Sequence, residues 1–257
     1  MTNYKHLILQ EENEFPRLFA DVCERDWGVL FFRTDNKNSH DSNHAILYPD
    51  KVVDLDMVLD EIKQFYLTKG IEPRLYLPFE AGYYQNNKTI FEQGNWDVEL
   101  YENQIMILTE SSSIDISQRL DVRRLNEWDD KITSEIYQAS ESEYEVEVDR
   151  RSLTHENYYL FVGYLDNIPV VLVSLHISAI GCTRFDYIET APKYRGKGYG
   201  REILHYVTNY CRQHQFPLCF QWPANETSAK ICNEVGFRND FVLSAGSAVF
   251  KPKEEMA

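Results

Sequence analysis

The stretch ETAPKYRGKGYGREIL, residues 189–204, places three glycines and four basic residues between two apolar runs. The run before it, RFDYIET (184–190), is typical of a strand, and GREILHYVTNYCRQH (200–214) has apolar residues at helical spacing. Glycine lets the backbone approach a ligand with no Cβ in the way, and the first amides of a helix have no partner within it. With the basic side chains, these amides predict a cradle for a pyrophosphate.

Two familiar phosphate-binding patterns differ from this turn in their spacing. A dinucleotide fingerprint that began at Gly196 would need glycine at position 201, where the chain has Arg201. The G-K-[ST] sequence of the nucleotide hydrolases is missing from the stretch. A turn that only caps a helix is also disfavoured, because it would not explain four basic residues in a chain of net charge -15.

The composition indicates a sizeable core and an acidic surface. The 257 residues are 43% hydrophobic, enough for one large domain or two small ones. The acidic balance disfavours nucleic acid as a partner and suits a cationic small molecule. Five cysteines without a C-x-x-C pair and seven histidines without metal spacing argue against a zinc site and a disulfide framework. We therefore expect a cytoplasmic protein with no metal, no signal peptide and no membrane segment.

The apolar pattern predicts an α/β chain in two domains, 1–112 and 113–257, with the boundary in the small polar stretch TESSSIDISQ (109–118). The first domain should contain a strand at 26–33, a helix at 54–70 capped by Asp54, a strand at 74–79, a short helix near 88–93 and a strand pair through 98–108. The second should contain a strand at 119–125, a helix at 126–140, a hairpin turning at Asp166-Asn167, then strand 184–190, helix 200–214, strand 216–222, helix 226–235 and strand 241–250.

Both halves end in the same order of elements, namely a helix, a strand after a proline, a helix, and a glycine close to an aromatic residue. We interpret this order as a faint internal repeat of one structural unit. The turn of the first half that would correspond to 189–204 is ILYPDKVVDLDMVL (46–59), which contains no glycine. We therefore do not expect the first half to bind a phosphate group in the same way.

The segment TAPKYRGKGYGREIL resembles motif A of the GNAT superfamily of acyl-CoA-dependent N-acetyltransferases, in which a strand, a proline and R/Q-x-x-G-x-G/A open a helix. NETSAKICNEVGF (225–237) is similar to the family's N-x-x-[SA]-x-x-[LI]-Y-x-x-x-G-F. The order of elements over 119–250 also matches the family. The resemblance implies a GNAT fold, an α+β mixed sheet, in the C-terminal half, and we interpret the smaller N-terminal domain as a degenerate GNAT-like unit.

The resemblance also implies acetyl-CoA as the co-substrate, with its diphosphate on the backbone amides of the turn. Its pantetheine arm would lie in a wedge between the strand ending at Thr190 and the strand beginning near Phe216. The residues thereby assigned to the cofactor are Ile188, Glu189, Thr190, Arg195, Gly196, Lys197, Gly198, Tyr199, Gly200, Arg201, Asn225 and Ser228.

The family's reaction is attack of a free amine on the thioester, and an alkylamine of pKa about 10 needs a base. The strand offers Asp186 and Glu189, which alternation places on opposite faces, and either could act directly or through a water. Where the family usually has a tyrosine as general acid, this chain has Cys232. Cys232 could donate a proton, another tyrosine could reach in, or no acid could be needed. We favour the simplest reading, in which Cys232 is a packed core residue.

A row of acidic residues precedes the hairpin, in a region that covers the acceptor pocket in the family. Its members are Glu141, Glu143, Glu145, Glu147 and Asp149. This row predicts a cationic acceptor such as a polyamine, an aminoglycoside or a lysine side chain, although a solvated loop is the alternative. We expect an N-acetyltransferase that acts on a small cationic amine or a peptide amine, with a homodimer left open. A non-catalytic acyl-CoA-binding module is the competing hypothesis, motivated by Cys232 and by the first half's lack of a cofactor turn.

Overall fold

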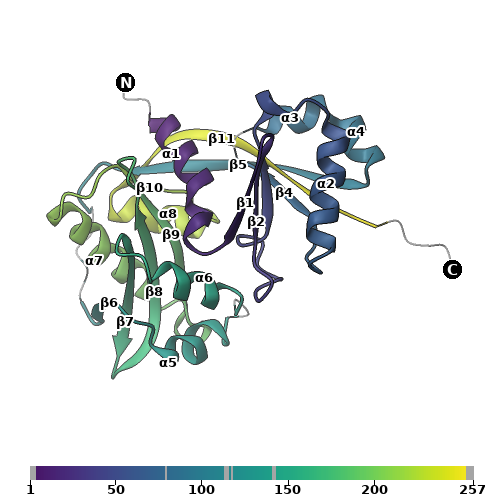
Figure 1. Ribbon diagram of the computed structural model, residues 1–257. Coiled ribbons are helices and arrows are strands. Elements are labelled where there is room, and N and C mark those ends of the chain that lie inside the picture. The colour runs from purple at the N-terminus through teal and green to yellow at the C-terminus, as the bar shows by residue number, and fades with distance from the viewer. Residues whose placement is uncertain (1–3, 79, 113–115, 117, 141–142, 253–257) are drawn as a thin grey trace. The chain divides into compact units, whose positions relative to one another are not determined.

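The computed structural model describes residues 4–78, 80–112, 116, 118–140 and 143–252 (Figure 1). The chain forms two compact units, each built from two segments. The first unit comprises 1–11 and 104–242, and the second comprises 12–103 and 243–257. The sequence predicts one boundary at 112/113, whereas the chain passes between the units after residues 11, 103 and 242. None of the helices in the described ranges has the length and apolar character needed to cross a bilayer.

The first unit is a mixed sheet in the order β11-β5-β10-β9-β8-β7-β6. The strands are β5 (Trp96–Leu108), β6 (Asp121–Leu125), β7 (Tyr158–Leu165), β8 (Ile168–Ile177), β9 (Thr183–Thr190), β10 (Cys219–Gln221) and β11 (Phe237–Phe250). Antiparallel pairing joins β6 to β7, β7 to β8, β8 to β9, and β10 to β5. Strands β9 and β10 pair in parallel, in contrast to the antiparallel pairs on either side of them.

Helices cover both faces of this sheet (Figure 1). One face packs on α7 (Tyr199–Gln213) and α8 (Glu226–Val235), and the other packs on α5 (Asp130–Ile132), the π-helical turn η3 (Thr133–Tyr137) and α6 (Glu145–Ser152). Strand β8 is buried along most of its length, which explains its nearly continuous apolar sequence. Helix α1 (Tyr4–Glu14) contributes Glu11, whose Oε1 lies 2.6 Å from Nδ1 of His176.

The second unit has the strand order β1-β2-β3-β4-β11. Its strands are β1 (Asp21–Arg25), β2 (Gly28–Phe32), β3 (His44–Leu47), β4 (Arg74–Leu77) and the end of β11. Its helical segments are η1 (Phe15–Leu18), η2 (Pro49–Lys51), α2 (Leu55–Leu67), α3 (Ala81–Asn86) and α4 (Lys88–Gln93). The buried face of α2 and the aromatic residues Tyr66, Phe91 and Trp96 form its core.

The two units repeat one arrangement, which supports the internal repeat expected from the sequence. In each unit, two parallel strands are joined through a helix, as β3-α2-β4 and as β9-α7-β10. The second strand then pairs with an antiparallel partner, β5 beside β10 and β11 beside β4. The partner strands are exchanged, because 104–108 of β5 belong to the first unit and 243–250 of β11 belong to the second.

Three elements differ from the sequence prediction. The expected strand pair through 98–108 is a single strand of 13 residues, β5, because no residue from 97 to 108 adopts the positive φ of a tight turn. The expected helix at 126–140 is shortened to α5 and η3. The acidic stretch contains helix α6. Residues 145 and 149 are four positions apart, so both lie on the side of this helix that faces the core.

Candidate functional site

The turn between β9 and α7 exposes backbone donors. After Thr190 the chain passes through η4 (Pro192–Tyr194) and then through Gly196 and Gly198, at φ of 73° and 86°. Gly198 is the N-cap of α7, so no side chain caps this helix. In the ranges that the structure describes, the amides of residues 196–201 donate to no protein acceptor. The row of donors that the sequence predicts is therefore present and unengaged.

The three glycines border open space. A Cβ built on Gly196 would meet no atom within 4 Å, and one on Gly198 would lie 3.5 Å from the guanidinium of Arg119. A Cβ on Gly200 would lie 3.5 Å from the hydroxyl of Thr190. Unengaged amides beside open space fit a diphosphate, whose oxygens accept hydrogen bonds and whose charge is favoured at a helix N-terminus.

The basic side chains of the turn are all hydrogen-bonded. Three of them have partners other than the β9 carboxylates: Lys193 Nζ lies 2.6 Å from Glu135, Arg201 Nε lies 2.6 Å from Glu234, and Lys197 Nζ lies 2.9 Å from the carbonyl of Lys193. Arg195 instead donates to Oε1 of Glu189 and to the carbonyl of Thr190, both at 2.9 Å. Arg195 keeps 54% of its side chain exposed, so solvent screens these contacts.

The corresponding turn of the second unit is closed by its own carboxylate. Asp54 caps α2, as the sequence predicts, and its Oδ1 accepts a hydrogen bond of 3.1 Å from the amide of Met57. A negative charge of the chain already occupies this helix N-terminus, where α7 has only Gly198. The two related turns therefore differ in the property that matters for binding an anion.

Strand β9 separates early from its parallel neighbour β10. Their pairing covers only Thr183 with Cys219 and Arg184 with Phe220. On its other edge, β9 stays paired with β8 as far as Thr190. The described residues therefore give 188–190 no β10 partner, and this is the splayed geometry expected of the strand pair.

A β-bulge in β9 changes the faces of the two carboxylates proposed as bases. One β8 residue, Ser174, lies opposite two β9 residues, Asp186 and Tyr187, and Ser174 Oγ accepts a hydrogen bond of 3.2 Å from the Tyr187 amide. A bulge interrupts the alternation of side chains. Asp186 and Glu189 therefore share one face of the sheet, and the expectation that they lie on opposite faces is wrong.

Glu189 and Asp186 have different neighbours. Glu189 accepts from Arg195 through Oε1 and from the Tyr187 hydroxyl, at 3.2 Å, through Oε2. Its side chain is 14% exposed. Asp186 forms an ion pair with Arg184, and among the residues that the structure describes it has no hydrogen bond to the glycine turn. Of the two carboxylates, Glu189 is the one linked directly to the turn.

The remaining site predictions fall on α8. Asn225 caps this helix, and its Oδ1 accepts from the amide of Ser228 at 3.0 Å and from its hydroxyl at 3.2 Å. Cys232 is 1% exposed and its sulfur accepts a hydrogen bond from Gln221. Burial raises the pKa of the Cys232 thiol to about 12. Cys232 thus has the surroundings of a packed core residue, and its contribution as an acid stays a prediction, as do the cofactor contacts of Asn225 and Ser228.

The acidic row is divided by helix α6. Glu145 and Asp149 face the core, Glu143 is exposed, and 45% of the Glu147 side chain is accessible. Glu141 lies outside the described residues. At least two of the five carboxylates are therefore buried rather than presented to solvent.

Glu202, in the first turn of α7, is a buried residue that the sequence analysis does not single out. Its Oε1 accepts from the amide of Leu120 at 2.6 Å and also from the amide of Arg119, and its Oε2 accepts from Arg119 Nε at 3.0 Å. These bonds hold the chain entering β6 against the start of α7. The sequence feature that could have identified Glu202 is its position four residues after the N-cap glycine, where the helix dipole favours a negative charge.

Replacing Glu202 with alanine is expected to lower the free energy of unfolding by about 2–3 kcal/mol, because two backbone amides lose a charged acceptor. Urea unfolding followed by circular dichroism measures the change. Glu127→Ala is the control, since Glu127 is exposed. Equal unfolding midpoints for the two variants would contradict this account of Glu202.

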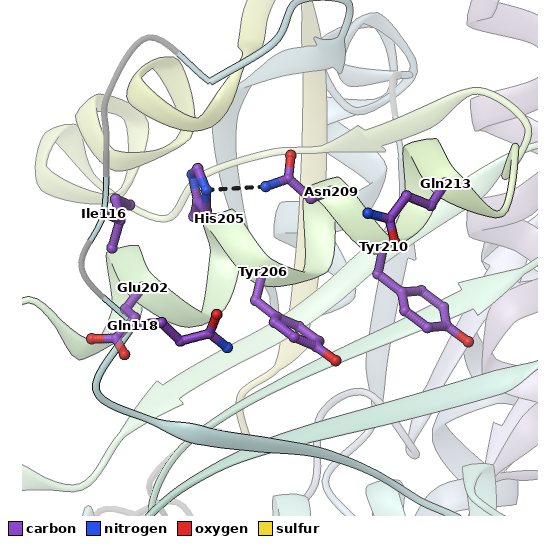
Figure 2. A pocket seen from close by; sticks show the side chains of 8 residues that line it. All are labelled: Ile116, Gln118, Glu202, His205, Tyr206, Asn209, Tyr210 and Gln213. Atoms are coloured by element: carbon purple, nitrogen blue, oxygen red, sulfur yellow. Dashed lines mark hydrogen bonds between the residues drawn. The ribbon is translucent and has the colours of Figure 1, made fainter.

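A pocket of about 260 Å³ runs along α7 (Figure 2). It is lined by Ile116, Gln118, Glu202, His205, Tyr206, Asn209, Tyr210 and Gln213. His205 Nε2 accepts from the Asn209 amide at 3.0 Å (Figure 2). Its Nδ1 lies 3.0 Å from Ser112 Oγ. These partners hold the imidazole of His205 in one tautomer.

Comparisons with known proteins agree with this architecture. Residues 122–237 match the family model described as the acetyltransferase (GNAT) family. No curated protein matches the sequence. Among solved structures, a GCN5-related N-acetyltransferase from Kribbella flavida is 12% identical, with a TM-score of 0.66 and coverage of 99% of this chain and 98% of that one.

Two further structures are similar over most of the chain. A GCN5-related N-acetyltransferase-like protein from Streptococcus suis is 13% identical with a TM-score of 0.52, covering 93% of this chain and 99% of that one. A tandem GNAT protein from the clavulanic acid biosynthesis pathway is 9% identical with a TM-score of 0.56, covering 82% and 74%. At these identities the likeness concerns the fold, which is that of GNAT proteins and includes a tandem example.

Proposed function

We propose that this protein transfers an acetyl group from acetyl-CoA to a primary amine. The premise is that residues 122–237 are a domain of the GNAT acetyltransferase family. The observation that carries the proposal concerns the part of the chain that the structure describes: there, the amides of 196–201 have no protein acceptor, and residues 188–190 of β9 have no partner on β10. A helix N-terminus with free donors stabilises a diphosphate, and a free strand edge pairs with amide groups of an extended ligand.

The residues of the turn and of β9 would hold the co-substrate. Amides of 196–201 would bind the diphosphate, and the backbone of Ile188 to Thr190 would pair with the pantetheine amides. Acetyl-CoA supplies the activated acetyl group as a thioester. Orienting the amine and the thioester toward each other contributes much of the rate through proximity.

We propose Glu189 as the base, in preference to Asp186. An ammonium acceptor must lose a proton before it attacks, and Glu189 lies on the strand that leads into the cofactor turn. Its carboxylate would accept this proton as the nitrogen–carbon bond forms, and the sulfur would then leave as a thiolate. Because a thiol has a pKa of about 8.5, its thiolate departs without the help of a strong acid, which is compatible with a buried Cys232.

The proposed acceptor is a small cationic molecule or a peptide amine, and the proposed compartment is the cytoplasm. The net charge of -15 attracts cations over a distance. The five cysteines are free thiols, which suits a reducing compartment.

The test is release of free CoA thiol from acetyl-CoA in the presence of spermidine, kanamycin or a lysine-containing peptide. Amine-dependent release, with acetylated product identified by mass spectrometry, is the expected result. Coenzyme A binding by calorimetry is measured in parallel. Binding without turnover on a broad amine panel would favour the competing function, a non-catalytic acyl-CoA-binding module, which the cysteine at position 232 also favours. Absence of binding would overturn both.

A further inference from the structure

Asp149 is a buried carboxylate without a role in the reaction proposed above. Its side chain lies on the inner side of α6 and the residue is 2% exposed. Oδ1 accepts from the hydroxyl of Tyr158, and Oδ2 accepts from the hydroxyl of Tyr137. Burying a charge is costly, and apolar residues in such a place often give an equally stable core. The cluster therefore calls for an explanation besides packing.

The first path from Asp149 runs through hydrogen bonds to the bulge. Tyr158 donates to Asp149 and is itself hydrogen-bonded to the side chain of Ser174. Ser174 Oγ accepts from the Tyr187 amide at 3.2 Å. An amide only donates and an ionised carboxylate only accepts, so the direction of every bond from Tyr187 to Asp149 is fixed.

The second path from Asp149 runs through the packing of aromatic rings and also ends at Tyr187. The ring of Tyr137 stacks on that of Tyr187, with centroids 6.0 Å apart and planes 15° apart. The Tyr187 hydroxyl donates to Oε2 of Glu189 at 3.2 Å. Both paths thus converge on Tyr187, one at its backbone and one at its ring.

We infer that Asp149 is a positioning residue, which fixes the β9 bulge and, through Tyr187, the orientation of Glu189. The role of Glu189 as the base is the part of this inference that rests on the proposed function. The ionised carboxylate holds both tyrosine hydroxyls as donors. Once protonated, Asp149 becomes a donor itself, and one of the two tyrosines has to reorient.

The pKa of Asp149 lies above that of an ordinary aspartate. Burial raises the pKa of Asp149 to about 6, although the two tyrosine hydroxyls oppose the shift. The titratable groups around it are Tyr137 on η3, Tyr158 on β7, Tyr187 on β9 and Glu145 on its own helix. The ordered arrangement is therefore expected above a pH of about 6 and is lost as the pH falls through that value.

Selective ¹⁵N labelling of tyrosine tests the inference in the full-length protein without any ligand. The amide signal of Tyr187, identified by its loss in Tyr187→Phe, should shift with a midpoint near pH 6. Asp149→Asn should abolish this titration. Glu147→Gln, on the more exposed side of the same helix, should preserve it. If Asp149→Asn does not fold, Tyr158→Phe breaks the same chain of bonds and should also abolish it.

A Tyr187 signal that does not titrate in the wild type, or that titrates equally in the variants, would overturn the inference. Coenzyme A affinity separates this outcome from a failure of the proposed function. Because the hydrogen bonds of Asp149 go to Tyr137 and Tyr158, which lie outside the turn, its asparagine variant should bind coenzyme A within about twofold of the wild type. A wild type that binds no coenzyme A refutes the proposed function and leaves the titration of Tyr187 to be judged by itself.

Discussion

Coenzyme A binding is expected to be lost in Gly198→Asp, with the fold retained. The new carboxylate would place a negative charge at the start of α7, where it would repel the diphosphate from the amides of the turn. Aspartate tolerates the left-handed backbone of position 198 better than most residues, so the strain costs only about 1 kcal/mol. We expect at least a ~100-fold loss of affinity by calorimetry, since charge-assisted hydrogen bonds are removed.

Gly181→Asp is the matched control for this prediction. Gly181 also has a positive φ, of 96°, and a Cβ there would meet no atom within 4 Å. It lies in the turn between β8 and β9, away from the start of α7. The same substitution should therefore leave coenzyme A affinity unchanged. Wild-type affinity in Gly198→Asp would refute the assignment of the turn, and a comparable loss in Gly181→Asp would point to a general effect on the fold.

Glu189→Gln is expected to reduce turnover by ~10²–10⁴-fold, the range for loss of a general base. The same change should strengthen coenzyme A binding up to about fivefold, because Arg195 no longer pairs with a carboxylate and is available to the diphosphate. Thiol release at saturating amine measures the first effect, and calorimetry without amine measures the second. Opposite changes in activity and affinity are difficult to obtain from a variant that is merely misfolded.

Asp186→Asn distinguishes between the two candidate bases. Asp186 pairs with Arg184, whereas Glu189 pairs with Arg195 of the turn, so the neutral variant at position 186 should leave coenzyme A affinity unaltered. We expect it to retain most of the turnover. A large loss of activity in Asp186→Asn, combined with a normal rate in Glu189→Gln, would transfer the role of the base to Asp186.

Local sequence was sufficient for the glycine turn, for the N-cap of α2 and for one hairpin turn. Gly196 and Gly198 of the turn have the positive φ values that glycine allows, and Asp54 caps the helix that begins after it. The Asp166-Asn167 pair has φ of 49° and 62°, as a tight hairpin turn requires. Each of these features depends on residues only a few positions apart, so the sequence contains the information directly.

The features that sequence reasoning missed depend on distant partners. The bulge at Asp186 and Tyr187 exists only relative to Ser174 on β8, and β9 itself has no glycine that would mark it. The burial of Asp149 requires two tyrosines from different elements. The exchanged strands require β4 to find residues 246–249, far along the chain. The alternation and spacing of residue types describe one strand by itself. The bulge, the burial of Asp149 and the exchanged strands each depend on contacts between distant parts of the chain.

The exchange of strands bears on the order in which the protein is completed during synthesis. Residues 243–250 supply the partner of β4, so the unit whose helices leave the ribosome early receives this strand from a segment synthesised much later. Folding during translation generally proceeds domain by domain from the N-terminus. Here the unit translated first would have to wait, with the edge of β4 exposed, until residues 243–250 had been synthesised. A nonsense codon near residue 243 would thus damage the N-terminal half of the protein.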